Sequence, residues 1–330
     1  MNKKLISLAI AGAFASASPA IFAAEAMSAS VSGYVDTIFV VDAEGADDTA
    51  LDVDGAAANP ANQKFTTTGE IDFVGSVGDV SARIDFDVTD GATDVEQAFI
   101  GWAANDAVAV NIGQQNSGVG FEAEDAPDLY QITNGQIQSV IAGQSSEGPG
   151  NNIEGVVAAF NAGPATIRVG MLDDLHGANE ENSLLLSVAG SPMDGLDLNL
   201  GVLTQADTTV LNAASLENII DAYATYSQDK WWVNLEILDA GTDGDSLVDT
   251  GYGLTGHMDF GNGFGATLRF DNLAYNDAGA TSVDDSTSTT IAGSYSAADN
   301  LDFLLEFRND DNGSTDYSTI QLEATATFGK

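Results

Sequence analysis

The sequence has 330 residues, of which 50 are acidic and 9 basic, and its formal net charge is −41 at pH 7. A field of this sign repels nucleic acid and attracts cations, so nucleic acid is excluded as a partner. The absence of cysteine excludes disulfides and thiolate metal sites. Only two histidines are present, and we assign no metal ligands from the sequence.

The N-terminus has the three parts of a secretory signal peptide. Residues 2–4 include two lysines, residues 5–14 are apolar, and Ala24-Glu25-Ala26 fits a small-residue cleavage pattern. We predict cleavage after Ala26, with Ala23 or Ala24 as alternatives. The apolar run is too short for a transmembrane anchor, which is the other interpretation. The predicted domains are a signal peptide, residues 1–26, and a single barrel, residues 27–330.

The strongest pattern after residue 26 has a period of two. In residues 80–88 apolar side chains alternate with polar ones, and residues 301–308 repeat the pattern. Successive side chains of a strand point to opposite faces, so the pattern predicts strands with one apolar and one polar face. No segment after residue 26 approaches the run of about 20 apolar residues that a spanning helix needs. If this chain crosses a membrane, we therefore expect it to do so as a closed barrel.

The connections between the predicted strands alternate between short turns and longer polar stretches. The longer stretches are 43–63, 90–94, 116–152, 172–182, 204–217, 239–249, 276–287 and 309–316. Together with seven short turns they separate sixteen strands. Aromatic residues lie beside the short turns, as in the interfacial girdles of outer-membrane barrels. We predict an all-β fold, an antiparallel transmembrane β-barrel of about 16 strands after a cleaved signal peptide. A soluble all-β protein is the alternative.

Two stretches resemble the OmpL-like β-barrel porins of Gram-negative outer membranes. The first contains Glu96-Gln97-Ala98-Phe99, a hairpin, the strand 108–114 and then Gly120-Phe121-Glu122. The second, residues 318–328, resembles a porin closing strand, whose terminal aromatic residue helps targeting to the barrel-assembly machinery. Gly329 and Lys330 depart from that ending because they follow Phe328. The resemblance implies an outer-membrane location and a homotrimer.

The alternation places charged side chains on the lumen face of such a barrel. The predicted pore-lining residues are Asp36, Glu70, Asp72, Arg83, Asp85, Asp87, Arg168, Arg269, Asp271, Glu306 and Arg308. These residues either shape the electrostatic field across a pore or form ordinary cross-strand ion pairs on a wall that is exposed to water. Both interpretations stay open. Porins commonly fold their third outer loop inward, which here is residues 116–152. The constriction candidates in that loop are Glu122, Glu124, Asp125 and Asp128, and the alternative is that they are solvated loop residues.

These features predict a passive, cation-preferring diffusion channel for small hydrophilic solutes, because rings of Asp and Glu favour cations. The expected partners are outer-membrane lipid, the barrel-assembly machinery, and the solutes and cations themselves. A structural or adhesive surface barrel with a plugged lumen is the alternative. We expect no enzyme, since no nucleophile motif accompanies His257. No cofactor is expected, although residues 52–55 and 243–245 leave loose Ca²⁺ binding at acidic outer loops open.

Overall fold

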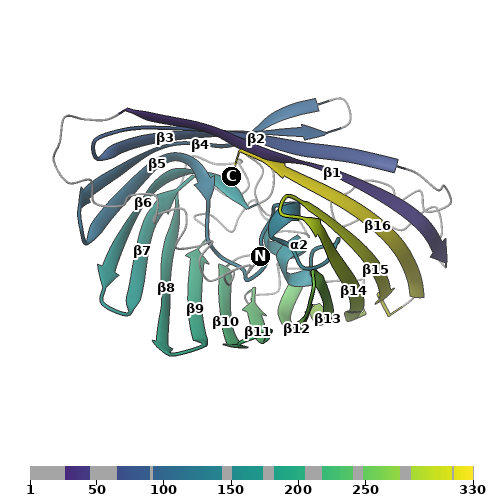
Figure 1. The fold of residues 1–330 in the computed structure, drawn as a ribbon. Coiled ribbons are helices and arrows are strands. Elements are labelled where there is room, and N and C mark those ends of the chain that lie inside the picture. The colour runs from purple at the N-terminus through teal and green to yellow at the C-terminus, as the bar shows by residue number, and fades with distance from the viewer. Residues whose placement is uncertain are drawn as a thin grey trace.

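The computed structural model describes residues 27–44, 65–89, 92–142, 151–173, 182–204, 218–240, 248–275, 284–313 and 316–329. Within these ranges sixteen antiparallel strands form one closed barrel, in which each strand pairs with its neighbours in the chain (Figure 1). The first strand closes the sheet by pairing with the last, with Gly33 opposite Phe328. The prediction of an antiparallel barrel of about 16 strands is confirmed. The predicted signal peptide and the segments 52–55 and 243–245 lie outside the described residues.

The strands are β1 (Ser28–Glu44), β2 (Phe65–Val77), β3 (Val80–Thr89), β4 (Ala92–Asn105), β5 (Val108–Asn116), β6 (Asn152–Ala162), β7 (Ala165–Leu172), β8 (Ser183–Met193), β9 (Leu196–Thr204), β10 (Asn218–Gln228), β11 (Trp231–Asp239), β12 (Val248–Gly261), β13 (Phe264–Tyr275), β14 (Ser286–Ala298), β15 (Leu301–Asp311) and β16 (Asp316–Phe328). Between β5 and β6 lie a short 3-10 helix, η1 (Ala126–Asp128), and a helix, α2 (Gln136–Ala142). In the described part of the chain, no helix is long and apolar enough to cross a membrane.

One predicted connection is wrong in length. Strand β3 ends at Thr89 and β4 begins at Ala92, so the predicted stretch 90–94 is shorter than expected. Thr93 and Asp94 pair with Val88 and Asp87 of β3. Consecutive polar residues break the period-two pattern, and the sequence therefore indicated a loop although the backbone continues the ladder.

Alternate residues of each strand face the outside and the inside of the barrel. In β11, Leu235 and Ile237 are exposed on the outer face, whereas Asn234, Glu236 and Leu238 between and beside them are buried. The same alternation leaves an apolar outer face around the barrel, as a lipid environment requires. The aromatic residues beside the short turns that are exposed are Trp102, Phe160, Tyr226, Phe260, Phe264, Tyr295 and Phe328.

The barrel encloses an apolar core at the end where the long connections lie. Ile137 and Ile141 of α2 are each 1% exposed and pack, with Val119, against inward-facing residues of the wall. The wall residues of this cluster are Ile153, Val157, Leu172, Leu185, Leu203, Ile219, Leu238, Ala240, Val248 and Leu273. They come from β6 to β13 and the residue after β11. Helix α2 is therefore held inside the barrel by burial of apolar surface (Figure 1).

Candidate functional site

Residues 117–142, between β5 and β6, lie inside the barrel, and among the described residues they are the main structure there. We call them the inserted segment. It is the third of the connections at the end opposite the short turns. Its hydrogen bonds reach β11, β13 and β15, far from it in sequence. The lumen geometry therefore depends on how this segment is fastened to the wall.

The guanidinium of Arg269 on β13 is the most connected polar anchor. It is 1% exposed, its Nη1 lies 2.8 Å from Glu122 Oε1, and its Nε lies 2.9 Å from Asp271. The same group donates hydrogen bonds to the carbonyl oxygens of Thr133 and Asn134. A guanidinium carries five donors in a fixed plane, so one side chain joins two parts of the inserted segment to the wall.

Strand β15 supplies a second anchor. Glu306 is fully buried, and its Oε2 accepts hydrogen bonds from the backbone N–H groups of Ile132 and Thr133, at 2.7 and 3.1 Å. Arg308 donates from Nη1 to the carbonyl oxygen of Asn134 at 2.9 Å. Since the carboxylate accepts and the guanidinium donates, the two side chains hold complementary groups of one short stretch of backbone.

An aromatic cluster joins the inserted segment to β10, β11 and β12. Phe121 packs edge-on to Tyr223 and Trp232, with ring centroids 5.5 and 5.8 Å apart. Tyr130 lies 5.0 Å from the Trp232 ring and 4.4 Å from the ring of His257. Edge-to-face contacts of this kind favour a defined orientation of the rings. His257, considered above for an enzyme site, is thus part of a packing cluster.

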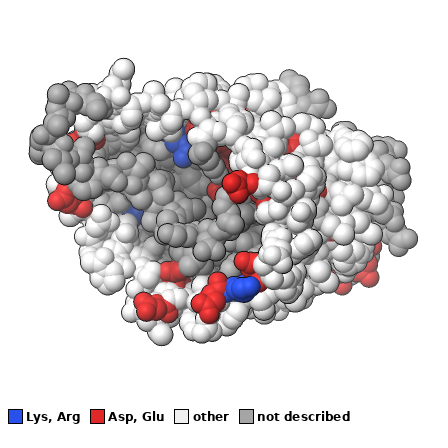
Figure 2. Space-filling view, viewed as in Figure 1, with Lys and Arg blue, Asp and Glu red and all other residues white. Residues whose placement is uncertain are grey.

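Between the inserted segment and the opposite wall, β1 to β4, lies a cavity of about 310 Å³. Its acidic lining residues are Glu70, Asp72, Glu96, Glu122, Glu124, Asp125 and Asp128. Its basic lining residues are Arg83 and Arg168. Figure 2 shows the same excess on the face that it draws, with acidic side chains in several places and few basic ones. We call this space the acidic cavity.

Arg83 is already paired with part of this charge. Its Nη2 lies 3.6 Å from Asp72 and 4.0 Å from Glu70, and its Nε donates to Asp85. Asp72 and Asp85 stand directly opposite each other on β2 and β3. One guanidinium thus offsets the repulsion within a cross-strand pair of like charges.

Glu124 and Asp125 bring two more carboxyl groups to the cavity from the inserted segment. Burial raises the pKa of Glu124 to about 7, and the negative charge of Asp125 raises it too, although the backbone N–H of Asn151 and the amide of Asn116 favour its ionised form. Burial also raises the pKa of Asp125. The charge of the cavity is therefore sensitive to pH near neutrality.

No family model and no curated protein matches the sequence. Among solved structures, the outer membrane channel DcaP of Acinetobacter baumannii is similar, with a TM-score of 0.62 and 15% identity over 92% of this chain and 98% of that one. A loop-deletion mutant of OmpT of Vibrio cholerae has a TM-score of 0.63 and 12% identity over 92% of this chain and all of its own. A mutant of the Rh. blastica porin has a TM-score of 0.57 and 14% identity, with the same coverage.

The chain has the fold of an outer-membrane porin. The neighbours named above are a channel, an outer membrane protein and a porin, and none of these three is named as an enzyme. Membership of the OmpL-like family stays a prediction, because the likeness is one of structure at low identity.

Within this porin fold, the predicted pore-lining side chains all face the interior. Asp36, Glu70, Asp85, Arg168, Arg269, Asp271 and Glu306 are buried, and Asp72, Arg83, Asp87 and Arg308 are partly buried. They do not form one group. Arg269 and Arg308 hold the inserted segment, whereas Asp36 accepts a hydrogen bond from Thr325 across the closing seam of the barrel.

The four constriction candidates also fall into two groups, two with polar partners and two that line the acidic cavity. Glu122 is engaged by Arg269, and Glu124 by Asn116, Asn151 and Asn152. Asp125 and Asp128 line the acidic cavity, and Asp128 has no salt bridge among the ion pairs of the described residues.

Sequence reasoning missed three residues of the barrel's interior. Tyr34 and Glu96 line the acidic cavity, and Glu236 accepts a hydrogen bond from the backbone N–H of Phe121 at 2.7 Å. Period-two alternation along β11 could have found Glu236. Glu96 lies at an irregularity in the β3–β4 register, between Asp85 opposite Gln97 and Phe86 opposite Val95, which alternation does not reveal.

Proposed function

We propose that this chain is a passive diffusion channel in the outer membrane of a Gram-negative bacterium, through which small hydrophilic cations pass more readily than anions. The observation that carries the proposal is the acidic cavity between the inserted segment and the β1–β4 wall. The porin fold and the apolar outer face of the barrel support the membrane location. The inserted segment would set the width of the passage.

The cation preference follows from the balance of charge in the cavity. Its lining carries more carboxylates than guanidinium groups, and Arg83 is already engaged by Asp72 and Asp85. A cleft of one sign with low-dielectric walls concentrates counter-ions. Carboxylates that line a channel favour cations in the same way. In this proposal the charges on the wall shape the field across the pore in addition to pairing across strands, which is the other interpretation of them.

Reversal potentials across a planar lipid bilayer test this proposal. In a KCl gradient the wild-type protein is expected to give the sign of a cation-preferring pore. The double variant Asp125→Asn and Asp128→Asn is expected to move the potential toward zero. Asp79→Asn, in the exposed β2–β3 turn, is the matched control and is expected to behave as wild type. An anion-preferring potential for the wild-type protein would overturn the cation preference.

A plugged structural barrel is the second candidate, and the apolar docking of α2 favours it. In that case the inserted segment would close the lumen, and the protein would insert into the bilayer without conductance steps. Steps in current from the wild-type protein would exclude this candidate. Insertion without steps, verified by heat-modifiable migration on a gel, would replace the channel proposal with it.

The remaining partners belong to the same proposal. Residues 318–328 belong to the closing strand β16, which the barrel-assembly machinery would bind, and the apolar outer face would contact lipid. We also propose the homotrimer that the porin resemblance implies. Native mass spectrometry in detergent tests the trimer, and a single mass of one chain would contradict it.

A further inference from the structure

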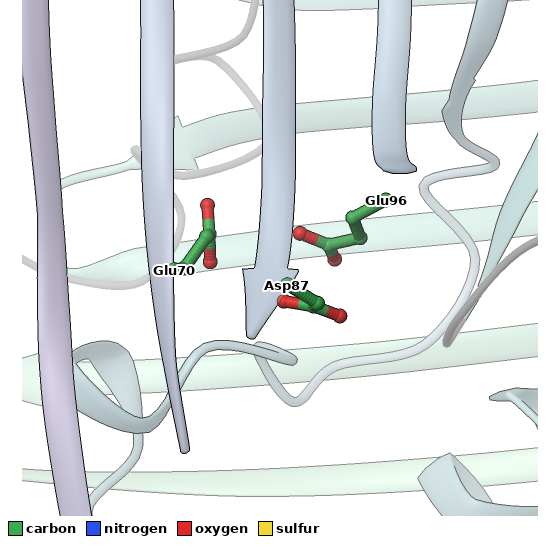
Figure 3. A group of neighbouring side chains, drawn as sticks. All are labelled: Glu70, Asp87 and Glu96. Carbon is green, nitrogen blue, oxygen red and sulfur yellow. The ribbon is translucent and has the colours of Figure 1, made fainter. Parts of the chain in front are cut away.

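Three acidic side chains meet on the inner face of neighbouring strands: Glu70 of β2, Asp87 of β3 and Glu96 of β4 (Figure 3). One carboxylate oxygen of each lies within 4.8 Å of the others. Glu70 and Asp87 stand directly opposite each other in the β2–β3 ladder. The register irregularity in β4 brings Glu96 to the same side. Like charges directly opposite across two strands repel each other, so this arrangement is unfavourable unless a cation or a proton offsets the charge.

Within the described ranges, no basic side chain forms an ion pair with Asp87 or Glu96. Arg83 reaches Glu70 only at 4.0 Å. The neighbouring like-charge pair, Asp72 with Asp85, does have Arg83 between its members. The two pairs lie side by side on the same strands, and Arg83 contacts both members of the first pair but only Glu70 of the second.

Two oxygens of the group are buried without any hydrogen-bond partner. These atoms are Oε2 of Glu70 and Oε2 of Glu96, and the two residues are 2% and 5% exposed. The other oxygen of Glu96 accepts a hydrogen bond from the amide of Asn152 at 3.1 Å, which fixes the carboxylate. A buried carboxylate oxygen without a donor is costly unless a cation coordinates it.

We propose that Glu70, Asp87 and Glu96 bind one Ca²⁺ ion on the lumen wall of the barrel. Oxygen-only ligands suit a hard cation, and the absence of histidine and cysteine from the group disfavours zinc. Calcium–oxygen distances are about 2.3–2.6 Å, so oxygens up to about 5 Å apart can share one ion. Calcium also accepts irregular geometry with water in its remaining positions, whereas Mg²⁺ requires a near-octahedral set. In the proposed channel, the bound ion would reduce the negative field of the acidic cavity.

Terbium luminescence offers a test that is specific to this site. Tyr34 stands opposite Glu70 in the β1–β2 ladder and lines the same cavity, so it can sensitise Tb³⁺ bound there. In the folded barrel in detergent, Tb³⁺ emission is expected to be displaced by Ca²⁺. Tyr34→Phe is expected to lose this component of the emission while Ca²⁺ affinity, measured by calorimetry, is kept. Glu96→Gln is expected to lose the emission and to weaken Ca²⁺ binding at least tenfold.

Thermal unfolding gives a second readout. Ca²⁺ is expected to raise the Tm of the wild-type protein and of Asp106→Asn, a control in the exposed β4–β5 turn. It is expected to raise the Tm of Glu96→Gln far less. Should Glu96→Gln fail to fold, Asp87→Asn takes its place in both measurements. An equal Ca²⁺ effect in wild type and variant, or no emission that depends on Tyr34, would overturn the proposal. Neither measurement requires conductance, so a failure of the calcium-site proposal can be distinguished from a failure of the channel proposal.

Discussion

Arg269 Nη1 lies 2.8 Å from Glu122 Oε1, and this buried ion pair joins strand β13 to the inserted segment. The two residues are 147 positions apart in the sequence. Both side chains are nearly inaccessible to solvent, so screening by salt is weak. The pair therefore anchors the inserted segment to the wall, unlike an exposed ion pair, which contributes little to the free energy of unfolding.

Replacement of Arg269 by methionine is expected to release the inserted segment. The variant would leave Glu122 and Asp271 buried beside each other without their cation, a loss of about 3–5 kcal/mol in the free energy of unfolding. Limited proteolysis with a glutamate-specific protease measures the release, because cleavage after Glu122 requires an accessible chain. Lys230→Met, in the β10–β11 turn, removes the same charge and is expected to keep the segment protected. Equal protection in both variants would show that the ion pair does not hold the segment.

The apolar contacts of α2 make a separate prediction. Ile141→Ala is expected to lower the free energy of docking by about 2–5 kcal/mol, since Ile141 is 1% exposed in the core. Hydrogen exchange measured by mass spectrometry should show faster exchange in residues 117–142 and unchanged exchange in β1 to β4. Ile100→Ala, at an outward position of β4, serves as a control outside this core. Unchanged exchange in the segment would contradict the role given to this core.

The tight fit of Gly118 against the wall can be tested with a matched pair of glycines. Gly118 has φ of +71°, and a Cβ there would clash with the guanidinium of Arg168. Gly163 has φ of +73°, and a Cβ added there would meet nothing within 4 Å. Gly163→Ala is expected to lower the free energy of unfolding only by the cost of a left-handed backbone conformation, about 1–2 kcal/mol. Gly118→Ala should lower the free energy of unfolding by more, because of the added steric clash, and this is measured as a larger fall in Tm. Equal falls in Tm would mean that the Arg168 side chain moves away from the added Cβ at little energetic cost.

The cation preference of the proposed channel is expected to depend on pH. The pKa of Glu124 is raised to about 7 from the ordinary value of 4.5, so this carboxyl group is neutral at pH 6 and charged at pH 8. The negative charge of the cavity, and with it the reversal potential, should therefore increase as pH rises through 7. Glu124→Gln is expected to flatten this part of the profile. A profile in the variant identical to that of the wild type would assign the dependence to other groups.

The strands and their faces could be predicted from the sequence because they depend on local alternation. The turn at 78–79 lies where the pattern placed it, the turn predicted at 228–229 lies one residue later, at 229–230, and Arg83 and Asp85 point inward as expected. The lumen could not be predicted in the same way. The contact of Glu306 with the backbone of Ile132 joins residues 174 apart, and no local pattern encodes it.

The three-carboxylate group shows the same limit at a smaller scale. Glu70 and Asp87 were predicted to line the lumen, but Glu96 was not. One register irregularity in the β3–β4 pairing decides on which side Glu96 lies, and alternation assumes that no such irregularity occurs. The part of the site made by regular strands was therefore accessible to sequence reasoning, and the part made by a departure from regularity was not.

The pairing of β1 with β16 has a consequence for biogenesis. Because β16 follows every other strand in the chain, the ribosome makes fifteen strands before the second partner of β1 exists. Until then the sheet has two open edges and an apolar outer face, a combination that invites aggregation in water. A chain that ends before Asp316 would keep both edges permanently. We therefore expect such truncated chains to be degraded or to aggregate rather than to form smaller barrels.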